Sequence, residues 1–444
     1  MSFTSPVFLF AFLPLTVIVY QLARSTKLKN AVWIAAGLLF YAFGDLRHLP
    51  LLLGSCLLHY GAGRYLMAQT KARRAVLLSC VALDLAVLAF YKVRGALPLG
   101  ISFYTFQAIS YVADTYKNPA DGTKNLREAL QYLTFFPQLT AGPFLKFSAL
   151  RPYLDRRETT WEKNAQGVRR FVCGLCKKVL LSTAAAKLAD AMFSLASIDA
   201  LGAWTGALGY CLQLYFDFSG YSDMALGLGL LFGVQLPENF RHPYCAGSVS
   251  EFWRRWHMTL SGWFRDYVYI PLGGSRNGRA RTVFNKLLVF LATGLWHGTG
   301  WTFVLWGLWH GAFCGAETLL DRNKTLKTHW YGHVYTLLVV IFGFVLFRAE
   351  SLPQALMLLR AMLSGFTPVD ACRLALRNLL TAGRGFWCLA GVLACLPLWE
   401  HAKARFDGSR WFSPALDALT IVGLLLCLMQ LASHSFQPFI YASF

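Results

Sequence analysis

The stretch LLVFLATGLWHGTGWTFVLWGLWHGAFCGA occupies residues 287–316 and contains no Asp, Glu, Lys or Arg. About 20 apolar residues suffice to cross the hydrocarbon core of a bilayer, so this run predicts membrane-embedded helix. The run also contains two histidines, His297 and His310. An ionisable side chain at membrane depth is costly and usually functional, so these two rings are the first candidates for chemistry.

The composition of the whole chain indicates an integral membrane protein. Its 444 residues are 56% hydrophobic and 14% charged, whereas a soluble domain carries about 25% charged residues. The net charge is +20, but basic residues fall between apolar runs, as in 24–29, 71–74 and 276–281. That pattern is typical of cytoplasmic loops near anionic headgroups rather than of nucleic-acid binding. We therefore predict an all-α, polytopic membrane protein with its N-terminus outside.

We expect about eleven transmembrane helices, together with re-entrant and interfacial helices. Asp84 lies inside one apolar run and needs a partner on a neighbouring helix. Pro137, Gly142 and Pro143 interrupt another run and predict a broken, re-entrant element. The apolar segments lie near 3–23, 30–44, 49–67, 75–91, 98–116, 132–147, 168–196, 204–236, 287–316, 334–348, 386–399 and 415–433.

Common cofactor and metal motifs do not occur in the sequence. Cys173 and Cys176 form a C-x-x-C pair, but no second Cys or His pair follows, so we interpret them as small buried hydrophobic residues. There is no G-x-S-x-G elbow, no Walker A loop and no dinucleotide fingerprint. Metal ligation by His297, His257 and Asp223 stays open, although no ligand spacing supports it. We expect no bound metal and no bound cofactor.

Acidic residues interrupt the apolar segment 204–236. Asp217 and Asp223 are costly at membrane depth unless they are paired or face water. Six residues apart on a helix, they point ~120° away from alignment. Ser219 and Tyr221 lie between them, and Asn239 follows in the Pro-bounded loop 236–244.

The segment 250–270 is too charged to span and predicts one interfacial or re-entrant amphipathic helix. At 100° per residue its side chains separate into two faces, which would leave His257 on the polar side near the membrane surface. The first face contains Phe252, Trp256, Thr259, Leu260, Trp263 and Tyr267. The opposite face contains Ser250, Arg254, His257, Ser261 and Arg265.

His297 is the stronger candidate of the two histidines in 287–316. Glycines beside it permit close substrate approach, and imidazole titrates near neutral pH, as a general base requires. On one straight helix His310 would lie ~20 Å away and point ~140° off. Only a break, for which Gly298, Gly300 and Gly307 provide places, would bring the two together. We interpret His310 as packing.

Several long motifs resemble the membrane-bound O-acyltransferase superfamily. They are FWRRWHMTLSGWFRDYVYIPLGGSR (252–276) and GLWHGTGWTFVLWGLWHG (294–311). Three further stretches are similar to the bacterial polysaccharide branch, which includes the membrane subunit of alginate O-acetylation and the D-alanine transfer protein of teichoic acids. These are 98–116, 135–147 and DFSGYSDMALGLGLLFGVQLPENFRHPY (217–244).

The resemblance implies a fold, a site and a reaction. The fold is one membrane-embedded domain over 1–444, with framework helices in 1–95, the motif-bearing core in 98–320 and C-terminal helices in 330–444, around a central funnel. The Trp-His-Gly histidine, His297, is implied as catalytic and His257 as its partner. The implied reaction moves an acetyl or other short acyl group from cytoplasmic acetyl-CoA toward an exported polysaccharide.

Within this hypothesis His297 acts as general base on the acceptor hydroxyl, and His257 positions or polarises donor or acceptor. Arg254, Arg255 and Arg265 are expected to attract the donor's phosphates. The other substrate-binding candidates are Asp217, Ser219, Tyr221, Asp223 and Asn239.

The expected surroundings are the bacterial inner membrane, its lipids, a glycan acceptor and a periplasmic partner that accepts the acyl group. Two alternatives stay open at this point. The first is D-alanyl transfer from a carrier protein to teichoic acid. The second is a proton-coupled transporter, for which an inverted repeat would be expected.

Overall fold

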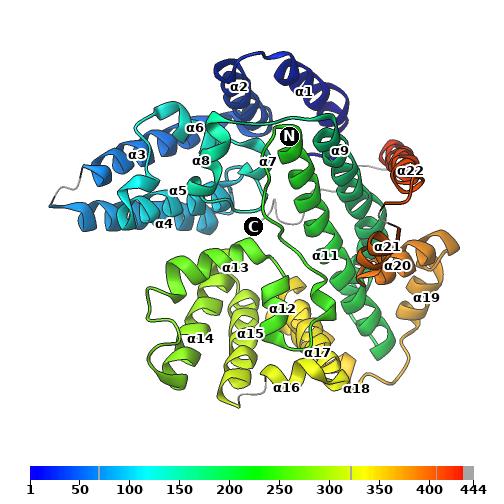
Figure 1. Ribbon diagram of the computed structural model, residues 1–444. Helices are drawn as coiled ribbons and strands as arrows, with labels where there is room; N and C mark the ends of the chain where they lie inside the picture. The colour runs from blue at the N-terminus through cyan, green and yellow to red at the C-terminus, as the bar shows by residue number, and fades with distance from the viewer. Residues whose placement is uncertain (69–70, 321–322, 407, 434–444) are drawn as a thin grey trace. The chain divides into compact units, whose positions relative to one another are not determined.

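The computed structural model describes residues 1–68, 71–320, 323–406 and 408–433, and its regular structure within these ranges is helical, without a strand. Figure 1 shows this all-helical architecture, which confirms the predicted fold class. The last residues of the expected C-terminal region, 434–444, lie outside the described residues.

The chain packs as two compact units that alternate along the sequence. Among the described residues, the first contains Met1–Gly174 and Tyr221–Glu238, and the second contains Leu175–Gly220 and the chain from Asn239 to Ser433. Two long helices, α9 (Trp161–Cys176) and α11 (Ala200–Leu231), therefore contribute to both units.

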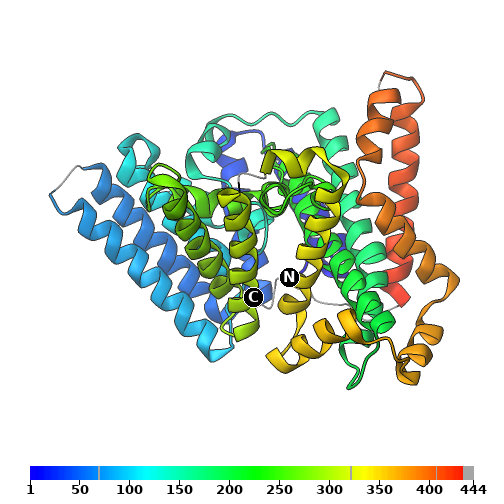
Figure 2. The same cartoon turned by 90° about the horizontal axis from the view of Figure 1, so that it is seen from below.

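The first unit is built around α5, a helix whose side chains are buried along almost its whole length. Apolar residues on every face of α5 explain this burial, because such a helix has no face to offer to water. Figure 2 shows α3 and α4 as antiparallel neighbours that pack with α5. Besides parts of α9 and α11, the helices are η1 (Phe8–Phe12), α1 (Leu13–Leu22), α2 (Thr26–Asp45), α3 (Leu49–Met67), α4 (Arg73–Arg94), α5 (Ile101–Lys117), α6 (Leu126–Leu133), α7 (Phe136–Leu139) and α8 (Phe147–Asp155).

The predicted partner of Asp84 is His59. The Nε2 atom of His59 on α3 lies 2.8 Å from Oδ2 of Asp84 on α4, and both residues are buried. The other ring nitrogen, Nδ1, lies 2.7 Å from the carbonyl oxygen of Ser55. The expectation that a neighbouring helix supplies the partner is confirmed.

The broken element predicted in 132–147 is also confirmed as a break. Helix α6 ends at Leu133. Helix α7 (Phe136–Leu139) is only four residues long, and Pro137 is its second residue. The side-chain amide of Gln138 donates to the carbonyl oxygen of Tyr132, at 2.9 Å. A buried side chain thus satisfies a backbone group that the broken helix leaves without its regular partner.

The second unit contains the motif-bearing region. Its helix α15 packs against both α14 and α17, and α12 packs on α15 and α17. Besides parts of α9 and α11, the elements are η4 (Lys177–Ser182), α10 (Thr183–Phe193), α12 (Val249–Arg255), α13 (Met258–Phe264), η6 (Arg265–Tyr269), α14 (Gly278–His297), α15 (Trp301–Leu319), α16 (Asn323–Thr328), α17 (Trp330–Arg348), α18 (Leu352–Ser364), α19 (Asp370–Leu379), α20 (Ala382–Ala394), α21 (Leu398–Phe406) and α22 (Phe412–Ser433).

Three described helices, α4, α17 and α22, are long and apolar enough to cross a membrane by themselves. The pair α20 and α21 would add a fourth span if its 70° bend lies within one crossing. Most of α22 and α4 is exposed, with 6% and 17% of the apolar window buried, as expected where lipid covers the helix surface. The predicted count of about eleven spans is not confirmed by this test.

Candidate functional site

The charge-free stretch 287–316 folds as a tight helical hairpin rather than as one helix. Helix α14 ends at His297 and α15 begins at Trp301. The two helices run antiparallel, since Gly294 lies against the backbone of Phe303 and Gly307 against the backbone of Phe290. A Cβ atom at Gly294 or Gly307 would collide with those backbones. Glycine at both positions therefore allows the close approach.

His297 occupies the end of α14, inside an aromatic enclosure. Its residue exposure is 4%. The ring centroid lies 4.8 Å from that of Trp296, 5.2 Å from that of Trp306 and 5.0 Å from that of Phe347. Three large rings thus exclude bulk water from the imidazole at the end of α14.

The segment 250–270 differs from the single amphipathic helix that its periodicity predicts. Helix α12 ends at Arg255, and α13 begins at Met258. His257 lies in the turn between them, with a positive φ of 43°. A wheel drawn at a constant 100° per residue fails at such a break, so the predicted polar-side position of His257 is wrong. The residue is buried, at 2% exposure.

The environment of His257 keeps its ring neutral. Both flanking helices have seven residues, far fewer than the ~20 needed to span a bilayer. Burial lowers the pKa of His257 to about 3, since water no longer solvates the charged form. The ring packs edge-to-face on Phe218, at 4.5 Å between centroids, and Nδ1 lies 3.2 Å from Oδ1 of Asn239.

His297 and Trp256, the residue before His257, both pack against α17. Phe344 packs against Trp256, the residue before His257, with centroids 5.2 Å apart. Phe347, one turn further along α17, packs against His297. The pairing of the two histidines that the resemblance implies, and their catalytic roles, stay predictions.

Helix α12 is also anchored directly on the hairpin. The buried carboxylate of Glu317 on α15 accepts hydrogen bonds from the backbone N–H groups of Val249 and Ser250, at 2.7 and 2.9 Å. A carboxylate at a helix N-terminus is favourable because it satisfies free N–H groups and the helix dipole. Trp253 of α12 packs on Trp306 of α15, at 5.5 Å between centroids.

His310 lies closer to this region than a straight helix would allow. Because the chain reverses after His297, Trp306 contacts both rings, with its centroid 5.2 Å from that of His297 and 5.3 Å from that of His310. The ~20 Å separation estimated for a straight helix therefore does not apply. Gly298 and Gly300 lie in the break, as the sequence suggested.

The three arginines expected to attract a donor differ in availability. Arg255 is bound by Glu251, at 2.6 Å between Nη2 and Oε1. Arg265 contacts Asp266 at 2.8 Å, yet its side chain is 65% exposed. Arg254 is exposed.

In the second unit, Asp217 of α11 forms a buried ion pair with Lys178. Of the two outcomes expected for Asp217, pairing or contact with water, the structure shows pairing. Ser219, two residues further on, is also buried, at 1% exposure.

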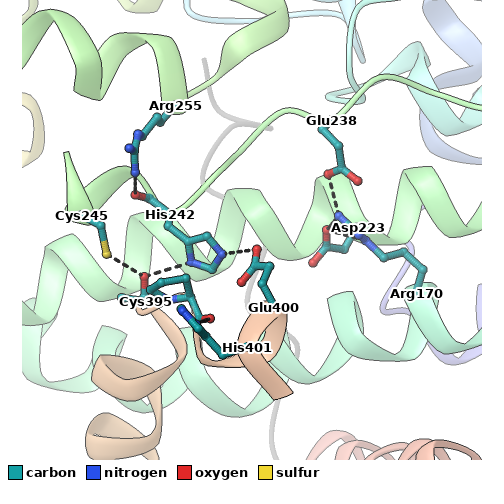
Figure 3. Close-up of polar contacts among 10 residues, drawn as sticks. Arg170, Asp223, Glu238, His242, Cys245, Arg255, Cys395, Glu400 and His401 are labelled. Atoms are coloured by element: carbon teal, nitrogen blue, oxygen red, sulfur yellow. Dashed lines mark hydrogen bonds and ion pairs between the residues drawn. The ribbon is translucent and has the colours of Figure 1, made fainter. Parts of the chain in front are cut away.

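In the first unit, Asp223 of α11 is held by Arg170 of α9. The shortest distance, 2.6 Å, joins Nη2 of Arg170 to Oδ1 of Asp223, and the same guanidinium contacts Glu238 at 2.7 Å. Figure 3 shows Arg170 between the two carboxylates. Tyr221 hydrogen-bonds Thr140 through its hydroxyl. Asp223 and Tyr221 thus both have partners within the first unit, Arg170 and Thr140.

The loop that carries Asn239 is fastened by His242. Its Nδ1 lies 3.2 Å from the carbonyl oxygen of Cys395, at the end of α20, and its Nε2 lies 2.6 Å from Glu400 of α21 (Figure 3). Arg255 donates to the carbonyl oxygen of His242 at 3.4 Å. Among the described residues, no group of three or more His, Cys, Asp or Glu side chains is arranged to hold a metal ion.

Comparison with known proteins assigns the family. Residues 120–358 match the membrane-bound O-acyltransferase family, MBOAT. Probable alginate O-acetylase AlgI of Pseudomonas putida is 36% identical over 489 residues, covering 100% of both chains. The chain belongs to the membrane-bound O-acyltransferase family. It is therefore a membrane-integral O-acyltransferase, which removes the transporter alternative.

Two further relatives differ in the acyl group and acceptor that their names state. Peptidoglycan O-acetyltransferase of Helicobacter pylori is 36% identical over 431 residues, covering 84% of this chain and 81% of the relative. Teichoic acid D-alanyltransferase of Bacillus subtilis is 28% identical over 276 residues, covering 57% of this chain and 69% of the relative.

Sequence reasoning missed two structural roles near the site. Glu317 anchors α12, and its signal was a lone carboxylate directly after a charge-free run. The other is Asn239, which contacts the backbone and side chains around His257, while its expected role in substrate binding stays a prediction.

Proposed function

We propose that this chain transfers an acetyl group from cytoplasmic acetyl-CoA toward an exported polysaccharide, with His297 as general base. The observation that carries the proposal is the buried His297 ring, enclosed by Trp306 and by Phe347 of α17, the helix that also packs against Trp256. Relatives named for acetylation of alginate and peptidoglycan support the choice of acyl group and acceptor class.

The reaction needs one proton to move twice. The imidazole of His297 removes the proton from the acceptor hydroxyl as its oxygen attacks the thioester carbonyl carbon. The C–S bond then breaks, and the imidazolium returns the proton to the departing thiolate. The surrounding rings exclude water, which favours transfer to the hydroxyl over hydrolysis of the thioester.

The exposed arginines are suited to the donor's phosphates. Arg254 and Arg265 keep exposed guanidinium groups near α12 and α13, although Arg265 is paired with Asp266, whereas Arg255 is paired with Glu251 and is less exposed. Two cations beside a binding path raise the local concentration of an anionic donor. The partners of Asp217 in the second unit, and those of Tyr221 and Asp223 in the first, favour a role in internal packing over direct contact with the donor.

In this proposal the chain lies in a bacterial inner membrane, with about eleven spans around a funnel. A periplasmic protein takes over the acyl group, because the product glycan lies outside the cytoplasm while the donor is cytoplasmic. Lipids and the glycan complete the set of partners.

The test replaces His297 with Gln, which preserves polarity and approximate size but cannot take up the proton. Loss of a general base lowers the rate by ~10²–10⁴-fold, so acetyl esters on extracellular glycan should fall to background in mass analysis. Exposed His401 provides the matched control, His401→Gln, which should leave acetylation unchanged. Wild-type acetyl content in a well-expressed H297Q strain would refute the assignment.

The second candidate is D-alanyl transfer, favoured only by the more distant relative of Bacillus subtilis. The same mass analysis separates the two, since alanine esters and acetyl esters differ in mass. Alanine esters that depend on the chain would replace the acetyl proposal.

A further inference from the structure

A pair of cysteines lies where helix α22 meets the end of α9. Of residues 412–433, all of which the structure describes, Cys427 is the one that is fully buried, at 0% exposure. Its thiol donates a hydrogen bond to the sulfur of Cys176, with 3.6 Å between the two Sγ atoms. Helix α22 packs on η4, the π-helical turn that follows Cys176 directly. The one buried side chain of α22 is therefore a thiol in contact with another thiol.

The two thiols are close enough to become a disulfide. Both are free cysteines in this structure. A disulfide has an S–S bond of ~2.05 Å, so two sulfur atoms that lie 3.6 Å apart need to approach by only ~1.5 Å. The neighbouring η4 is a second sign of a special site, because π-helical turns are rare and occur frequently at functional sites.

The two cysteines differ in exposure. Cys176 is half-buried, whereas Cys427 is buried. The sequence interpretation of Cys173 and Cys176 as buried residues is therefore wrong, since Cys173 is exposed as well. A small reagent reaches Cys176 first, and the thiol of Cys427 is already in contact with the sulfur that has reacted. Redox-sensitive cysteines are often accessible and placed beside a second thiol of this kind.

We propose that Cys176 and Cys427 form a redox modification site, at which a hydroperoxide converts the two thiols into a disulfide that ties α22 to the end of α9. In the first step the sulfur of Cys176 attacks the terminal oxygen of the hydroperoxide. The O–O bond breaks, Cys176 becomes a sulfenic acid, and its thiol proton passes to the departing oxygen, which leaves as an alcohol. Where the oxidant is hydrogen peroxide, the leaving molecule is water.

In the second step the sulfur of Cys427 attacks the sulfenic sulfur of Cys176. The S–S bond forms, the S–O bond breaks, and hydroxide leaves as water with the thiol proton of Cys427. The two thiols together lose two electrons, and the hydroperoxide is reduced by the same two electrons. No step uses the acyl donor or either candidate histidine.

The surroundings of the pair favour a hydroperoxide over a charged oxidant. Helix α22 is apolar enough to cross a membrane, and 6% of its apolar window is buried inside the protein, so lipid is expected around it. A hydroperoxide is small and uncharged and enters such surroundings at low cost. Oxidised glutathione carries charges that would have to leave water.

The experiment treats purified full-length protein in nanodiscs with cumene hydroperoxide, blocks the remaining thiols with N-ethylmaleimide and analyses the digest by mass spectrometry. We expect a peptide pair joined through Cys176 and Cys427 that separates on reduction with dithiothreitol. Hydrogen peroxide should give the same product, and oxidised glutathione should give it at least ~10-fold more slowly. Absence of this product with both hydroperoxides, or equal rates with oxidised glutathione, would overturn the proposal.

Three variants separate the roles of the cysteines. Alanine keeps each site small and apolar, so Cys427→Ala and Cys176→Ala preserve the packing. C427A should stop at a sulfenic acid on Cys176, which dimedone captures, whereas C176A should leave Cys427 reduced. The matched control is Cys173→Ala, which removes an exposed thiol from the same helix and should form the disulfide at the wild-type rate. A disulfide between Cys173 and Cys176 in the wild type, or no sulfenic acid in C427A, would contradict the assignment.

Thermal unfolding tests whether the disulfide ties α22 in place. The bond joins residues 251 positions apart, and a cross-link over a long loop restricts the unfolded chain. Oxidation should raise the thermal midpoint of the wild type by at least ~3 °C and leave the midpoints of C176A and C427A unchanged. A midpoint that does not rise although the disulfide has formed would refute the tie.

Discussion

Removing Asp84 should destabilise the α3–α4 pair by an amount that depends on the replacement. His59 and Asp84 are 1% and 8% exposed, and Nε2 lies 2.8 Å from Oδ2. Because the carbonyl oxygen of Ser55 only accepts, Nδ1 of His59 must carry a hydrogen. A single hydrogen therefore lies between Nε2 of His59 and Oδ2 of Asp84.

The magnitudes follow from what each variant leaves buried. Asp84→Asn can donate its amide hydrogen to Nε2, so it should cost no more than a typical net hydrogen bond, about 0.5–1.5 kcal/mol. Asp84→Leu leaves Nε2 buried without that partner, at about 1–3 kcal/mol. His59→Leu leaves a buried carboxyl group alone, at about 3–5 kcal/mol. The double variant H59L/D84L leaves neither group and should be more stable than H59L.

The assay is thermal unfolding of the purified variants in one detergent, followed by tryptophan fluorescence. The expected order of midpoints is wild type, D84N, D84L and H59L, with the double variant above H59L. The coupling energy of the double-mutant cycle is the decisive quantity. Costs that add within about 0.5 kcal/mol would show that the two side chains act independently and would refute this reasoning.

Two further predictions concern the hairpin and the start of α11. Gly307→Val should lower the thermal midpoint and the rate of acetyl transfer together, because its side chain would meet the carbonyl oxygen of Phe290. Gly300→Ala should change neither, because the nearest neighbour of the added Cβ atom lies at 3.7 Å. Equal effects of the two variants would contradict the close-packing argument. For Asp199, burial alone raises the pKa, but the N–H groups of Val369 and Gly202 outweigh it and hold the pKa below its ordinary value. The stability that Asp199 contributes should be complete above pH ~4 and lost as the pH falls through the folded-state pKa. The difference in thermal midpoint between wild type and Asp199→Asn should therefore disappear in acid. A difference that stays constant from pH 7 to pH ~3 would contradict this prediction.

The sequence by itself determined the membrane class, the helical fold and the need for charge partners. Apolar runs without charge can satisfy their backbone in lipid only as helix, so composition was enough. Asp84, Asp217 and Asp223 required partners because an isolated carboxylate at membrane depth is too costly. Their partners, His59, Lys178 and Arg170, are the kind of residues that this argument demands.

Only the tertiary structure decided how the site residues are arranged. A periodicity argument assumes an uninterrupted helix, and it failed at His257, because Trp256 and His257 separate α12 from α13 and His257 has a positive φ. That turn is stabilised by Asn239, eighteen residues upstream, and sequence spacing contains no information about such a contact. The reversal after His297 likewise brings His310 next to Trp306. Long-range hydrogen bonds and close backbone packing, rather than local preference, fix these positions.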